Sequence, residues 1–92
     1  MKADKTEKTV CVCAWYSPRG FANEGDYLYG TLEQWRDFIA KRDPDPYLAR
    51  WDIISRHHNL QAARARAEKE VRISRRRVAW GEQDYTSAQP LV

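Results

Sequence analysis

The segment from Leu60 to Val78 constrains the fold most, because its pattern predicts one long helix with a narrow apolar stripe. At 100° per residue the small and apolar positions fall within an arc of about 80°; these positions are Leu60, Ala63, Ala67, Val71, Ser74 and Val78. Such small side chains allow close approach to a hairpin or another helix. Asn59 is expected to cap the start of this helix, and Gly81 to end it.

Cationic residues occupy most of the remaining circumference of this helix, and Ile73 sits among them. The segment holds seven basic residues against Glu68 and Glu70, a local net charge of +5, while the other positions hold nine basic and eleven acidic residues. Neighbouring like charges destabilise a helix slightly unless a partner compensates them. The guanidinium group suits phosphate and carboxylate partners. We therefore predict that the helix binds an anionic partner through Arg64, Arg66, Lys69, Arg72, Arg75, Arg76 and Arg77, with Arg19 as a secondary contact.

The first third of the chain predicts a β-hairpin. Residues 9–16 are rich in β-branched and aromatic residues without a breaker, which is typical of a strand. Residues 17–20 (Ser-Pro-Arg-Gly) have turn chemistry. The return strand is expected between residues 21 and 30, with residues 26–29 as its core.

A helix is predicted to follow. The Thr31 hydroxyl and the Gln34 side chain have capping-box spacing, and the apolar positions that follow have helical spacing; they are Leu32, Trp35, Phe38 and Ile39. Residues 43–46 (Asp-Pro-Asp-Pro) should end this helix.

Asp45 and Pro46 are expected to begin another helix as its cap and first residue. Leu48, Trp51 and Ile53 or Ile54 would form its apolar stripe, reaching about His57. A third strand is the alternative, since Trp51 and the two isoleucines also suit a sheet. The start at Asp45 favours the helix.

Together these elements predict an α+β fold in which an N-terminal β-hairpin packs against two to three helices, the last one long and Arg-rich. The 92 residues suffice for one small domain, and residues 1–8 and 82–92 are expected to be irregular tails. No run of residues is apolar enough for a membrane span and no secretory signal is visible. The two cysteines fit a reducing cytoplasm.

The sequence contains no motif for reaction chemistry. Cys11, Cys13, His57 and His58 lack the usual spacing of zinc ligands, and no phosphate loop or nucleophile elbow is present. We therefore expect no catalytic residue, metal, cofactor or small-molecule substrate. Sheet aromatics could stack on bases, but in so small a core they are expected to be structural; they are Trp15, Tyr16, Phe21, Tyr27 and Tyr29.

The hairpin segment Trp15-Tyr-Ser-Pro-Arg-Gly-Phe-Ala-Asn23, combined with the unbalanced basic helix in a small chain, resembles the phage-encoded anti-CRISPR proteins that act on type I surveillance complexes. The resemblance implies a non-enzymatic inhibitor in the host cytoplasm. It would bind the Cas proteins and crRNA of such a complex and sterically block target DNA. Several such inhibitors are acidic DNA mimics, whereas this helix has the opposite sign.

The segment from Ala62 to Glu70 and the arginines after it are also similar to the arginine-rich helices that dock in RNA hairpin grooves, as in phage antiterminators. This resemblance implies a small RNA- or DNA-binding accessory or regulatory protein. Those helices usually sit in disordered chains, and this chain is expected to be folded.

Overall fold

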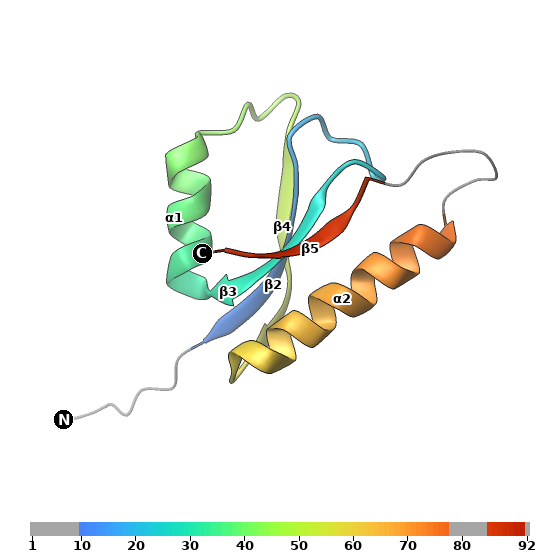
Figure 1. The fold of residues 1–92 in the computed structure, drawn as a ribbon. Coiled ribbons are helices and arrows are strands. Elements are labelled where there is room, and N and C mark those ends of the chain that lie inside the picture. Colours follow the sequence, from blue (N-terminus) through green and yellow to red (C-terminus); the bar gives the residue numbers. More distant parts are fainter. Residues whose placement is uncertain (1–9, 78–84, 92) are drawn as a thin grey trace.

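The computed structural model describes residues 10–77 and 85–91. The elements follow in the order β2 (Cys11–Ser17), β3 (Asp26–Thr31), α1 (Leu32–Arg42), β4 (Arg50–His57), α2 (Leu60–Arg77) and β5 (Ser87–Pro90). The strands form one sheet in the order β4-β2-β3-β5, and α1 and α2 lie on opposite sides of it (Figure 1). The predicted α+β class is therefore confirmed, with two helices among the described residues.

Strand β2 is the most buried strand, and it pairs antiparallel with β3 on one side and β4 on the other. Cys13 faces Tyr29 in one ladder and Ser55 in the other. Strand β5 pairs parallel to β3 and forms the opposite edge of the sheet from β4. Alternation along β2 sends Cys11, Cys13 and Trp15 to one face and the residues between them to the other.

The α1 side of the sheet holds the large apolar core. Val12, Ala14, Leu28 and Trp35 form its buried centre, with exposed fractions of 5% or less. Partly buried residues surround this centre; they are Tyr16, Leu32, Phe38, Ile39, Ile53 and Leu91. The rings of Trp35 and Phe38 stack at 5.7 Å between centroids. This face therefore stabilises α1 mainly by burying large side chains.

Helix α1 begins as predicted. The Thr31 hydroxyl accepts a hydrogen bond from the Gln34 amide at 3.1 Å, and Gln34 Oε1 accepts one from the Thr31 amide at 2.9 Å. Asp43 ends the helix in the left-handed conformation, with φ of 43°. The capping box predicted from the sequence is confirmed.

The predicted helix over residues 46–57 is wrong, because Arg50–His57 form strand β4. Asp45 does begin a helical turn, since its carbonyl accepts hydrogen bonds from the amides of Leu48 and Ala49, but the turn goes no further. Leu48 is 59% exposed, so the expected helical stripe is not buried. Ile53 instead packs on the α1 side of the sheet.

The expectation of an irregular tail over residues 82–92 is also wrong in part, because Ser87–Pro90 form β5. Ser87 donates a hydrogen bond to Asp26 at 2.7 Å, and the Leu91 amide donates one to the Tyr29 carbonyl at 2.8 Å. Pro90 fits here because an edge strand can lack one amide donor. The predicted tail over residues 1–8 and the predicted stop at Gly81 lie outside the described residues.

Candidate functional site

Helix α2 lies along the second face of the sheet and touches all four strands. Its contact side consists of small residues: Ala63 and Ala67 are fully buried and Val71 is 7% exposed. The Asn59 carboxamide accepts a hydrogen bond from the Ala62 amide at 2.8 Å and caps the helix. The contact with the sheet is narrow, and the charged residues on the opposite side of α2 are exposed to solvent.

Two of the predicted binding arginines are neutralised within the helix. Arg64 pairs with Glu68 at 3.1 Å and Arg66 with Glu70 at 2.7 Å, each four residues on. The hydrogen bond to Glu68 is the main cause that raises the pKa of Arg64. Both acidic residues of α2 therefore already have an ion-pair partner, and neither pairs with the remaining cations of the helix.

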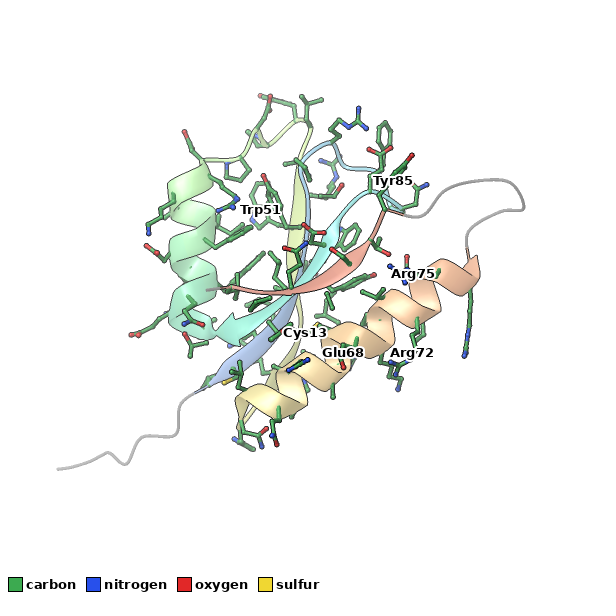
Figure 2. The ribbon with its side chains drawn as sticks, in the orientation of Figure 1. Cys13, Trp51, Glu68, Arg72, Arg75 and Tyr85 are labelled. Atoms are coloured by element: carbon green, nitrogen blue, oxygen red, sulfur yellow. The ribbon has the colours of Figure 1, made fainter. Side chains whose placement is uncertain are left out.

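Arg75 has a structural contact. Its Nη2 donates a hydrogen bond to the Thr86 carbonyl at 3.3 Å, which joins α2 to the residue before β5. Figure 2 shows Arg75 on the β5 side of α2 and Arg72 on the side turned away from the sheet. Arg75 therefore flanks the exposed side of the helix without lying at its centre.

Three cations remain at the centre of the exposed side: Lys69, Arg72 and Arg76, which we call the outward stripe. Their spacing of three and four residues places them within an arc of about 60°, opposite the buried alanines. All three are exposed. Among the described residues none of them has a carboxylate partner. The stripe is roughly 10 Å long at 1.5 Å per residue.

The other two predicted contacts lie apart from the stripe. The backbone of Arg77 belongs to α2, and its side chain lies outside the described residues. Arg19 lies between β2 and β3, where it forms an ion pair with Glu24 and covers the Phe21 ring at 5.5 Å. Of the eight predicted contacts, the structure brings three together as a cluster that has no carboxylate partner among the described residues.

The cysteine and histidine residues form no metal centre in residues 10–77 and 85–91. No group of three or more His, Cys, Asp or Glu side chains there could hold a metal ion. Burial raises the pKa of Cys13 to about 11, so its thiol is protonated at neutral pH. His57 Nε2 lies 2.7 Å from Ser55 Oγ, but no described carboxylate completes a triad with them.

Most of the aromatic residues of the sheet have structural contacts. The rings of Trp15 and Tyr27 lie 4.8 Å apart, and Tyr16 meets Phe38 edge to face at 5.3 Å. Phe21, however, is 52% exposed and is not part of the core, and Trp51 in β4 is 36% exposed. Tyr47 is 88% exposed, and the sequence analysis does not single it out. Tyr47 lies within the segment predicted as a helix that begins at Asp45 and Pro46, so no sequence signal indicated an exposed turn there.

Comparison of the chain with protein-family models, curated proteins and solved structures finds no match. Neither helix in the described part of the chain is long and apolar enough to cross a membrane.

Proposed function

We propose that this protein is a non-enzymatic inhibitor of the anti-CRISPR kind, which binds a crRNA-containing surveillance complex through the outward stripe of α2 and sterically blocks target DNA. The observation that carries this proposal is the separation of charges on α2. Glu68 and Glu70 neutralise the flanking arginines, while Lys69, Arg72 and Arg76 face solvent together. This arrangement leaves three cations available to an anionic partner.

The chemistry of the stripe suits phosphate groups or acidic side chains of a protein. Guanidinium groups donate paired hydrogen bonds to phosphate and carboxylate oxygens. Grouped like charges weaken a helix slightly, and packing of Ala63, Ala67 and Val71 against the sheet offsets that cost. The sheet therefore acts as a support that holds the cations in one row.

The small size of the stripe favours a ribonucleoprotein over free nucleic acid. Three phosphate contacts give only a modest, salt-sensitive attraction, with a slope of about 0.7 log units per phosphate on single strands. Tight binding then requires further contacts with protein. The proposal also implies that the protein acts in the bacterial cytoplasm, where such complexes assemble.

A small RNA- or DNA-binding accessory protein is the second candidate. The observation that favours it is the composition of the exposed side of α2, where the apolar neighbours of the three cations are Ala65 and the half-buried Ile73. However, one side of α2 is covered by the sheet, so α2 cannot be surrounded by an RNA groove as an isolated helix can.

Binding to a purified type I surveillance complex, and separately to its free crRNA, tests both candidates. We expect wild-type protein to bind the complex far more tightly than the RNA, and K69E/R72E/R76E to bind at least ~30-fold more weakly. The control K41E/R36E/R56E changes the net charge equally at exposed residues outside α2 and should retain affinity. Equal binding of free RNA and complex would favour the accessory protein, and unchanged binding by the stripe variant would contradict both.

A further inference from the structure

A group of exposed apolar side chains lies at one end of the sheet, far from the start of α2. Phe21 is 52% exposed, Tyr47 88%, Leu48 59% and Tyr85 60%. We call these four residues the loop-end patch. Exposed apolar residues are ordinary when scattered, but several large ones gathered together mark an interaction surface.

The patch is formed where two connections meet. Residues 18–25 and residues 43–49 lie at the same end of the sheet (Figure 1). Gly20 has φ of +79°, and a Cβ added there would lie 2.5 Å from the Leu48 carbonyl oxygen, so the two connections are in contact. The Tyr85 amide donates a hydrogen bond to the Asn23 carbonyl at 2.9 Å, which joins the segment before β5 to the same place.

Hydrogen bonds within residues 17–25 fix the backbone of the first connection, residues 18–25. Ser17 is fully buried, and its Oγ lies 3.1 Å from the Phe21 carbonyl oxygen and 3.2 Å from that of Glu24. Backbone hydrogen bonds from Gly20 to Ser17 and from Glu24 to Phe21 close two turns. The backbone that carries the Phe21 ring is therefore fixed before any partner binds.

The second connection is fixed by Asp45. Its carboxylate accepts a hydrogen bond from the Tyr47 amide at 2.8 Å, and its carbonyl accepts bonds from Leu48 at 3.2 Å and Ala49 at 2.8 Å. Ala49 is buried, with 3% exposure, and anchors the connection to the sheet. Tyr47 and Leu48 are thus displayed on an ordered turn.

Display of apolar side chains on ordered connections is a property of protein-binding anchors. Aromatic residues are enriched among the side chains that contribute most to interfaces. A side chain on a fixed backbone loses less freedom on binding, so more of the contact energy appears as affinity. The loop-end patch has both properties: aromatic side chains and an ordered backbone.

The charges around the patch indicate a protein partner instead of a nucleic acid. Arg19 is neutralised by Glu24, and Arg50 donates to the Ala49 carbonyl. Asp43 and Asp45 are both exposed at its border. The guanidinium of Arg42 lies over the Phe38 ring at 3.7 Å, so it is held on the α1 side. The other charged residues at the border, three acidic and two basic, give a local net charge of −1, opposite in sign to α2 and unfavourable for phosphates. The acidic border of the patch complements a partner surface that has an apolar recess rimmed by lysine or arginine. A protein that itself binds RNA can carry such a basic rim.

We infer that the loop-end patch is a second contact of this protein, through which Phe21, Tyr47 and Leu48 enter an apolar, basic-rimmed recess on a protein subunit of the ribonucleoprotein. This inference rests on the proposed function and adds to it a contact with a protein subunit of the complex. The outward stripe meets the anionic part of the complex, and the patch meets a basic protein surface.

Affinity for the purified type I surveillance complex, measured at two salt concentrations, tests the inference with the triple variant F21S/Y47S/L48S. We expect at least ~30-fold weaker binding at both salt concentrations, because the lost contacts are apolar. The control is V10S/L60S, whose residues are also exposed apolar ones (37% and 51%) near the other end of β2; it should bind as the wild type does. Circular dichroism melting identifies any variant that is unfolded, and single substitutions at Tyr47 then replace the triple variant.

Other results would overturn the inference. If F21S/Y47S/L48S binds normally while the stripe variant binds weakly, the loop-end patch is not a contact with the complex. The proposed function would then still stand. Absence of binding by the wild type would overturn both. Loss of affinity for free crRNA in the patch variant would assign the patch to nucleic acid. A wild-type dimer that this variant converts to a monomer, seen by analytical ultracentrifugation, would assign the patch to a second copy.

Discussion

The two faces of the sheet hold their helices in different ways. On one face α1 buries large side chains around Trp35 and Leu28. On the other face α2 approaches the sheet through Ala63, Ala67 and Val71 and covers Cys13. The packing of α1 is therefore stabilised mainly by the apolar area that it buries, and the packing of α2 by its close approach to the sheet. The comparison teaches that α2 needs only one narrow side for stability, which leaves its charged side available for binding.

The largest expected effect lies on the α1 face. Trp35→Ala removes a ring that is 5% exposed and stacks on Phe38. Substitutions of this kind cost about 3–5 kcal/mol, a large share of the stability of a domain this small. Urea unfolding followed by circular dichroism measures the change. A loss below about 1 kcal/mol would contradict the assignment of this face as the main core.

The next largest effect tests close approach on the α2 face. Ala67→Leu places three extra carbon atoms at a fully buried position, and overpacking of this kind costs about 1–3 kcal/mol. Ile39→Leu on the α1 face conserves volume and should cost less than about 1.5 kcal/mol. If Ala67→Leu stabilises the protein in the same urea assay, the α2 contact is loose and the comparison fails.

A pH effect distinguishes the two faces further, because a thiol is buried only under α2 among the residues described here. Burial raises the pKa of Cys13 to about 11, from the ordinary value of 9.0. The unfolded thiol loses its proton first as the pH rises, so this contribution to stability is complete below pH 9 and declines toward pH 11. Unfolding free energies of wild type and Cys13→Ala, compared between pH 8 and 11, should converge. Parallel curves would contradict burial of the thiol.

The smallest effects concern the charges of α2. Arg66→Ala breaks a half-buried pair with Glu70 and should cost about 0.5 kcal/mol, near the value for helical ion pairs. Alanine at Lys69, Arg72 or Arg76 should change stability by no more than about 0.5 kcal/mol, as at ordinary surface positions. Thermal melts of the four variants compare the two groups directly. A marked loss of stability in the stripe variants would assign these cations to folding.

Local chemistry made much of the fold predictable. Thr31 and Gln34 are three residues apart, and their capping box depends on no distant contact. Strand β4 was only the alternative to a helix, because Asp45 and Pro46 favour a helix start and because a β-bulge inserts Ile54 between the pairs Ala14–Ile53 and Cys13–Ser55. The extra residue interrupts the two-residue alternation that identifies a strand. Strand β5 has no apolar pattern at all, and only its pairing with β3 defines it.

The surroundings of the predicted binding residues on α2 could be foreseen only in part. The excess of arginine in α2 is visible in the sequence, and so are the acidic residues four positions after Arg64 and Arg66. The sequence does not show which side of the helix the sheet covers, and this decides that Lys69, Arg72 and Arg76 are central while Arg75 contacts Thr86. The loop-end patch depends on contact between two connections distant in the chain, which no local pattern reports.

The salt dependence of binding to the crRNA-loaded complex tests the central claim most directly. The three cations of the stripe lack a carboxylate partner in residues 10–77 and 85–91. They predict a slope of about 2 for the logarithm of Kd against the logarithm of salt concentration if all three meet phosphates. The neutral variant K69Q/R72Q/R76Q should bind more weakly with a slope near zero. Equal slopes for the two proteins would show that the outward stripe does not meet the anionic partner, and would contradict the account.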